Sequence, residues 1–149
     1  MRSGHTVRLD FDSTFEMLDL VQVVSDHLAR DIGLDDDSLH WVGVAVRESV
    51  INAIKHGNRN DAAKHVFIEF ESATRSAVPE LLIRVRDEGE GFDPENVANP
   101  LDPENLLKSS GRGIFLIRNF MDDVRMQRAP EGGMEIRMVK RVQASAADA

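Results

Sequence analysis

The order in which hydrophobic spacing changes along the chain is the feature that most limits its fold. Apolar residues recur at helical spacing in 13–33, in 35–57 and again from Gly113 onward. Apolar and polar residues alternate, as in half-buried strands, in residues 5–11, 66–70, 81–85, 124–127 and 134–140. This order favours an α/β (α+β) two-layer sandwich, with a mixed, mainly antiparallel sheet and helices on one face.

Local signals mark where these segments begin and end. Ser13 followed by Glu16 is a capping-box pattern for the first helix, and the acids 35–37 are favourable at the start of the second. Gly57–Asn58 indicates a left-handed cap at the end of the second helix. A loop containing Pro79 is expected between the second and third strands.

Composition excludes several classes of protein. The 149 residues suit one domain, predicted over 1–142, with a disordered tail over 143–149. Lys and Arg total 18 against 26 Asp and Glu, and this net charge of −8 argues against direct nucleic-acid binding and against docking on anionic membranes. There is no cysteine, no apolar run long enough to span a membrane and no signal-peptide pattern, so the expected location is cytoplasmic.

Two segments carry polar residues or glycines that could bind a ligand. Glu48 and Asn52 are four residues apart and share one helix face, and His56 continues that row. The same residues could simply be a solvated face. Further along, Asp87 precedes Gly89 and Gly91 at the end of an apolar strand, where the backbone can approach a ligand closely, although an ordinary glycine-rich turn would have the same composition.

A third segment, residues 109–113, leads into the third helix. Glycines ahead of a helix expose free backbone N–H groups and the positive end of the helix dipole, which suits a phosphate, and Lys108 and Arg112 could add charge. A flexible loop before an ordinary helix would explain the same residues. Residues 87–110, which join the second and third segments, form an unusually long irregular stretch. Irregular segments of this length inside a compact domain are more often functional than purely connecting.

Taken in order, these three segments resemble the nucleotide-binding boxes of the GHKL ATPase/kinase superfamily. The segments are ESVINAIKHG from Glu48 to Gly57, Asp87-x-Gly89-x-Gly91, and Gly111-x-Gly113. Asn52-Ala-x-x-His56-Gly57 and the run NFMDDV, residues 119–124, resemble most the anti-sigma-factor serine/threonine protein kinases. The resemblance covers nearly the whole chain and implies the GHKL (Bergerat-type) ATP-binding fold.

The resemblance also implies roles for individual residues. Asn52 would hold Mg²⁺, and Glu48 would be the general base that acts on an incoming serine. Asp87 would accept a hydrogen bond from the adenine amino group, and residues 99–110 would form a lid. The nucleotide-binding residues that it implies are Asn52, Asp87, Gly89, Gly91, Lys108, Ser110, Gly111, Arg112 and Gly113.

The implied function is that of an ATP-dependent, Mg²⁺-requiring protein kinase and anti-sigma factor in transcription regulation and stress response. It would phosphorylate a serine of a STAS-type anti-anti-sigma protein, sequester a sigma factor and form a homodimer. Met134 stands where the family has a threonine, and Ser109 where some relatives have an arginine. These departures motivate the alternative of an inactive, nucleotide-dependent switch module. The ATP-binding half of a histidine kinase is disfavoured, because His27 lies on the first helix without room for a phosphoacceptor hairpin.

Overall fold

The computed structural model describes residues 4–89 and 116–143. Residues 116–120 are helical, a 3-10 turn precedes the first helix and a π-helical turn follows the second. The elements are β1 (Thr6–Asp12), the 3-10 turn (Phe15–Met17), α1 (Leu18–Ile32), α2 (Asp36–Asn52), the π-helical turn (Ala53–Gly57), β2 (His65–Arg75), β3 (Val78–Arg86), β4 (Asp123–Arg128) and β5 (Met134–Arg141). The predicted order of elements is confirmed, except that the predicted start of the third helix at Gly113 lies outside the described residues.

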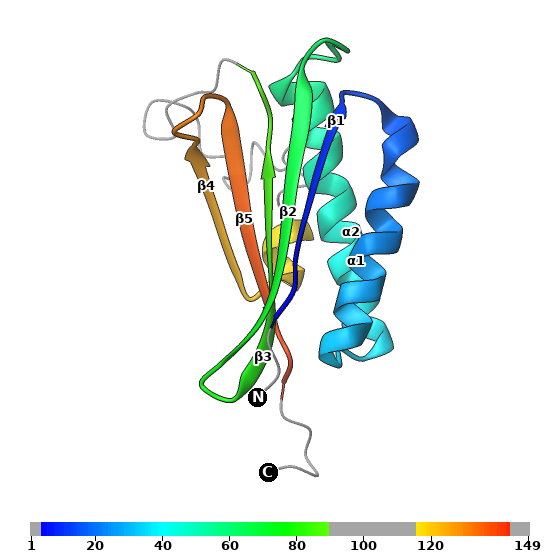
Figure 1. Ribbon diagram of the computed structural model, residues 1–149, viewed down its shortest axis with the longest axis vertical. Helices are drawn as coiled ribbons and strands as arrows, with labels where there is room; N and C mark the ends of the chain where they lie inside the picture. The colour runs from blue at the N-terminus through cyan, green and yellow to red at the C-terminus, as the bar shows by residue number, and fades with distance from the viewer. Residues whose placement is uncertain (1–3, 90–115, 144–149) are drawn as a thin grey trace.

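The five strands form one sheet in the order β1-β2-β3-β5-β4, and every pairing among them is antiparallel. Figure 1 shows α1 and α2 side by side against one face of this sheet, with the short helix 116–120 on the same side. The predicted two-layer architecture with helices on one face is therefore confirmed.

The hydrophobic core lies between the helices and the inner face of the sheet. Every second residue of the central strands points inward, which is why alternation was visible in the sequence. Each fully buried side chain of this size contributes about 1.5–3 kcal/mol relative to exposure. The core side chains on the central strands β2, β3 and β5 are Val66, Ile68, Phe70, Leu81, Ile83, Val85, Ile136 and Met138, and those on α2 include Val42, Val46 and Val50.

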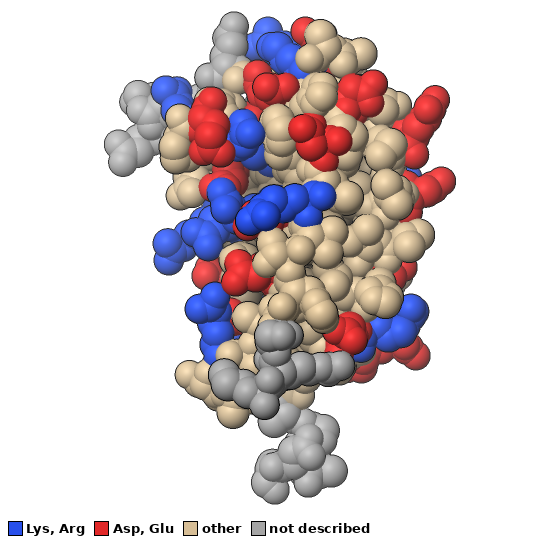
Figure 2. Space-filling view, viewed as in Figure 1, with Lys and Arg blue, Asp and Glu red and all other residues tan. Residues whose placement is uncertain are grey.

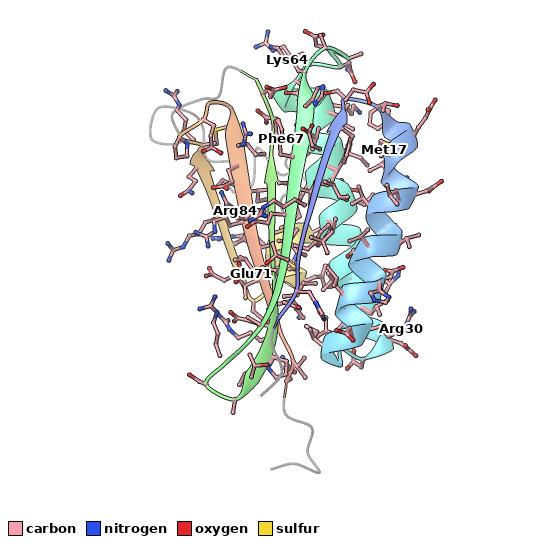
Figure 3. The ribbon with its side chains drawn as sticks, in the orientation of Figure 1. Met17, Arg30, Lys64, Phe67, Glu71 and Arg84 are labelled. Atoms are coloured by element: carbon pink, nitrogen blue, oxygen red, sulfur yellow. The ribbon has the colours of Figure 1, made fainter. Side chains whose placement is uncertain are left out.

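The outer face of the sheet is charged. On it, Nε of Arg8 lies 2.8 Å from Oε2 of Glu69, and NH2 of Arg84 lies 2.5 Å from Oε1 of Glu135. In Figure 2, Lys and Arg side chains gather over the strands, interspersed with Asp and Glu, and Figure 3 labels Phe67 and Arg84 of this face. Antiparallel sheets commonly bury one face and solvate the other in this way.

The helix ends are set by side-chain caps, one of which differs from expectation. Thr14, not Ser13, caps the turn that leads into α1, because its Oγ1 accepts a hydrogen bond from Glu16 N at 3.3 Å. The Ser13 hydroxyl instead donates to the carbonyl oxygen of Lys64 at 2.7 Å. Asp35 caps α2 by accepting from Ser38 N at 2.7 Å, as the acidic run at this position suggested.

The hairpin between β2 and β3 is tighter than expected. Pro79 lies inside β3, and the connection consists of Ser76 and Ala77, both with left-handed backbone (φ 53° and 65°). Two consecutive residues with positive φ match a type I′ turn, whose twist suits a two-residue hairpin. Neither residue is the glycine or asparagine usually found there, so the sequence did not predict this turn.

Exchanging these two residues for the preferred pair is expected to stabilise the protein. The double variant Ser76→Asn/Ala77→Gly relieves the steric cost of left-handed backbone, offset in part by the entropy of glycine, for a net gain of about 1 kcal/mol. Thermal unfolding should then show a midpoint higher by roughly 2–4 °C. The control Ala73→Gly, within β2, should lower it; an unchanged or lower midpoint for the turn variant would contradict the assignment.

Candidate functional site

Glu48 and Asn52 lie on one flank of α2, beside its buried face. The neighbouring Ser49 is buried and donates to the Ala45 carbonyl oxygen at 2.8 Å and to Met138 Sδ at 3.3 Å, which fixes the rotation of the helix. Glu48 and Asn52 are half-buried, and neither side chain is hydrogen-bonded or ion-paired to another described residue. A half-buried carboxylate and amide that no described residue partners are candidates for binding a ligand.

After Asn52 the helix widens into the π-helical turn Ala53–Gly57. A π turn changes the rotation per residue, and such turns often occur at functional sites. His56 is exposed, whereas Glu48 and Asn52 are half-buried. The predicted polar row therefore ends at Asn52 and does not continue to His56.

Asp87 is buried at the end of β3, with 5% of its surface exposed. Its Oδ1 accepts hydrogen bonds from Gly89 N at 2.9 Å and from Met134 N at 3.1 Å. Burial raises the pKa of the Asp87 carboxyl above its ordinary value, against the two backbone N–H donors, which act to lower it. No described residue donates a hydrogen bond to Oδ2, so this oxygen remains an acceptor.

Three glycines surround Asp87. A side chain at Gly57 would collide with the Asp87 carboxylate, and one at Gly133 with the Asp87 backbone carbonyl. A side chain at Gly89 would collide with the carbonyl oxygen of Gly57. These contacts bring the end of α2, the residues after β3 and the start of β5 together around one carboxylate, so Asp87 and Gly89 lie next to the helix that carries Glu48 and Asn52.

The prediction of a left-handed cap at Gly57–Asn58 is wrong. Asn58 has φ −87°, and the left-handed residues are Arg59 (φ 53°) and Asn60 (φ 60°). Gly57 is needed for the close approach of Asp87 rather than for its own φ. Sequence spacing cannot distinguish these two reasons for a glycine, because the neighbour comes from a distant strand.

Part of the predicted site lies outside the described residues. This applies to the lid, 99–110, and to the departure at Ser109. It also applies to the predicted nucleotide-binding residues Gly91, Lys108, Ser110, Gly111, Arg112 and Gly113.

Asn58 is a buried residue beside Asp87 that the sequence analysis named only as part of a helix cap. It is fully buried, and its Nδ2 donates to Ser13 Oγ at 2.7 Å and to the His65 carbonyl oxygen at 2.9 Å. Its Oδ1 accepts from Glu88 N at 2.7 Å. Asn58 thus ties the residues after Asp87 to β1 and β2. Its position directly after the His56-Gly57 pair was the only available signal.

Replacing Asn58 with alanine is expected to destabilise the fold by about 2–4 kcal/mol, because it leaves buried donors and acceptors without partners. Urea unfolding would measure this loss. The control Asn60→Gly, at an exposed left-handed position, should change stability by less than about 0.5 kcal/mol. If the two variants were equally stable, the bonding role given to Asn58 would be wrong.

The helix 116–120 is held against both layers. The Phe120 ring stacks on the Trp41 ring of α2, with centroids 3.8 Å apart and planes at 7°. Lys140 Nζ on β5 donates to the Phe120 carbonyl oxygen at 2.9 Å, where a cation favours the end of a helix. Trp41 precedes Glu48 by two helical turns, so helix 116–120 faces the flank of α2 that carries Glu48 and Asn52.

Residues 11–140 match the model of the histidine kinase-like ATPase domain. The chain belongs to this family. This match confirms the fold that the resemblance implied, and the relatives described next confirm the resemblance to the anti-sigma kinases.

This histidine kinase-like ATPase domain is similar to anti-sigma F factors and to a serine-protein kinase. It is 37% identical over 113 residues to an anti-sigma F factor of Oceanobacillus iheyensis, covering 73% of each protein. It is 36% identical over 115 residues to the anti-sigma F factor of Bacillus subtilis, covering 74% of this chain and 75% of that protein. It is 28% identical over 141 residues to the serine-protein kinase RsbW of Staphylococcus epidermidis, covering 90% and 85%.

A solved structure supports the fold of the domain. The crystal structure of the RsbU and RsbW domains of Rv1364c from Mycobacterium tuberculosis matches with a TM-score of 0.63 and 17% identity. The match covers 95% of this chain and 34% of that one, so the domain spans about a third of the solved chain. Among the described residues, no helix combines the length and apolarity needed to cross a membrane.

Proposed function

We propose that the chain is an ATP-dependent serine/threonine protein kinase and anti-sigma factor. It would phosphorylate a serine of a STAS-type anti-anti-sigma protein and sequester a sigma factor. The observation that carries this proposal is the pair of half-buried side chains of Glu48 and Asn52, which have no partner among the described residues. They lie on the helix that leads into the π-helical turn whose Gly57 packs against Asp87. The names of the related anti-sigma F factors and of the RsbW kinase support it.

Asp87 would recognise the adenine base. Its Oδ1 is occupied by two backbone donors, which leaves Oδ2 as the acceptor for the exocyclic amino group. Gly89 and Gly91 would shape the space for the purine ring. The absence of a side chain at Gly57 and Gly89 is what lets these segments lie so close together.

Asn52 would be the protein ligand of Mg²⁺. Its amide oxygen is a hard, neutral donor without a partner among the described residues, which suits this ion. Mg²⁺, when held by Asn52, would neutralise negative charge on the phosphates during the transfer. The phosphates would be held by Lys108, Ser110, Gly111, Arg112 and Gly113.

Glu48 would act as the general base. In the transfer, the serine hydroxyl oxygen bonds to the γ-phosphorus, the bond from that phosphorus to the bridging oxygen of ADP breaks, and Glu48 accepts the hydroxyl proton. No described residue is hydrogen-bonded or ion-paired to the Glu48 carboxylate, so its oxygens are free to contact the serine hydroxyl. Asn52, one turn further along, would hold the metal beside the same reacting centre.

Partners and location form part of the same proposal. The related anti-sigma F factors suggest a sigma factor and its antagonist as protein partners in the cytoplasm, with no direct contact to nucleic acid because the net charge is −8. We also propose a homodimer. Light scattering of the purified chain would test this, and a monomer at all concentrations would reject it.

A second candidate is a nucleotide-dependent switch without transfer activity. Met134 favours it, because its backbone N–H donates to Asp87 while its thioether offers no hydroxyl to the nucleotide. In this case ATP would alter only the affinity for a protein partner. Stoichiometric phosphorylation of a STAS protein would exclude it.

Incubation with labelled ATP, Mg²⁺ and candidate STAS proteins tests the leading proposal. We expect phosphoserine on one STAS protein, and none when Mg²⁺ is chelated. Binding of ATP without transfer to any candidate would favour the switch. A chain that binds no ATP would reject both functions.

A further inference from the structure

Arg86 is the last residue of β3 and directly precedes Asp87, but its side chain lies on the outer face of the sheet. Its NH1 donates to the Gly132 carbonyl oxygen at 3.5 Å, and its Nε lies 3.3 Å from Oε2 of Glu131. Its Cζ lies 4.1 Å from the centroid of the Phe67 ring. With 17% of the side chain exposed, one guanidinium group therefore connects β2 and β3 to the turn between β4 and β5.

The strand that follows this turn supplies one of the two N–H groups that bind Oδ1 of Asp87, and Gly89 supplies the other. Met134, its first strand residue, donates its N–H to Oδ1 at 3.1 Å, and Gly133 packs against the Asp87 backbone. The turn contains Gly132 (φ 105°) and Gly133 (φ 80°) in succession. The turn is closed internally by hydrogen bonds from Ala129 N to the Gly133 carbonyl oxygen at 2.9 Å and from Gly132 N to the Ala129 carbonyl oxygen at 3.0 Å. Because glycine restricts the backbone least, the Arg86 contacts add a restraint from outside the turn.

We propose that Arg86 is a positioning residue for Asp87. By holding Glu131 and Gly132, it fixes the Met134 N–H against Oδ1 and thereby aims Oδ2 at the base. The inference rests on the proposed function, because it assigns to Arg86 a share in base selection. An outer-face residue that contacts no nucleotide would then decide how well the domain distinguishes adenine from a base without the 6-amino group.

The first measurement uses the ligand-free protein. In Arg86→Gln, the Met134 amide should exchange its hydrogen about tenfold faster than in the wild type, since one hydrogen bond is worth roughly this factor. Amides in the middle of the β3–β5 ladder should be unchanged. The control Arg8→Gln removes another outer-face ion pair, with Glu69, and should leave Met134 unaffected. Unchanged exchange at Met134 in Arg86→Gln would overturn the proposal.

The second measurement compares ATP with inosine triphosphate, which has a carbonyl where adenine has an amino group. The wild type should prefer ATP, and Arg86→Gln should lose about tenfold of that preference while its affinity for inosine triphosphate stays the same. An equal loss for both nucleotides would indicate a merely structural role and overturn the proposal. Arg8→Gln should retain the full preference.

A double-mutant comparison tests the contact itself. Glu131→Gln should reduce part of the preference for ATP over inosine triphosphate. The double variant Arg86→Gln/Glu131→Gln should lose no more of this preference than Arg86→Gln alone, because both substitutions remove the same contact. Fully additive losses would overturn the proposal. If the wild type showed no preference for ATP, the proposed role of Asp87 would fail, whereas amide exchange at Met134 would still decide whether Arg86 holds the turn.

Discussion

The variant Asp87→Asn is expected to bind ATP about 100-fold or more weakly than the wild type. The Asp87 Oδ1 already accepts two backbone N–H groups, so the asparagine oxygen must take that place. Its NH₂ group then occupies the position of Oδ2. A donor would face the adenine amino group, which is also a donor, and the buried pair would be unsatisfied.

Isothermal titration calorimetry with ATP measures this effect. The matched control is Glu88→Gln, which removes a carboxylate from the next residue but keeps an oxygen to accept from His65 N. It should bind ATP with nearly wild-type affinity. An Asp87→Asn variant that bound ATP as tightly as Glu88→Gln would show that Asp87 does not contact the base.

The same variant should alter the pH dependence of folding. Because burial raises the pKa of Asp87 in the folded state, the folded protein takes up this proton at a higher pH than the unfolded chain does. The contribution of Asp87 to the free energy of unfolding therefore increases as pH falls through the folded pKa toward 3.8, and is smallest above the folded pKa. Asp87→Asn has no titrating carboxyl and should lack this increase. Its free energy of unfolding should therefore compare best with that of the wild type near neutral pH, and fall behind as the pH is lowered.

The variant Glu48→Gln is expected to lose phosphoryl transfer by a factor of about 10²–10⁴ while still binding ATP. Glutamine has the shape of glutamate but cannot accept the serine proton. Glu48 has no partner among the described residues, so its replacement should change the free energy of unfolding by less than about 0.5 kcal/mol. The loss would then be chemical rather than structural.

Initial rates of phosphate transfer to a STAS protein, with ATP affinity measured separately, check this expectation. Arg47→Gln changes the adjacent, exposed residue and serves as the control, with an unchanged rate. Transfer at the wild-type rate by Glu48→Gln would remove Glu48 from the reaction. A parallel loss of ATP affinity would assign Glu48 to binding instead.

The helices and strands could be predicted because their burial repeats locally. Val66, Ile68 and Phe70 alternate whichever strand lies beside them, and the acids at 35–37 mark a helix start without reference to the rest of the chain. The pairing of Glu48 with Asn52 on one flank followed from helical spacing alone. These features depend on neighbours only a few residues away.

The features that were missed depend on distant contacts. Gly57 is a glycine because Asp87 approaches it, and Asn58 is buried because Ser13, His65 and Glu88 offer it partners. The left-handed Ala77 sits in a turn that strand pairing imposes on an ordinary residue. In each case tertiary structure overrides a local preference, which the sequence of one chain does not reveal.

The stacked pair of Trp41 and Phe120 gives the domain an optical property. The chain contains one tryptophan and no tyrosine, so its near-ultraviolet emission arises from a single indole ring. That ring stacks on the ring of Phe120, in the helical residues 116–120. Its fluorescence is therefore an intrinsic signal of whether α2 and this helix are in contact, obtained without any label.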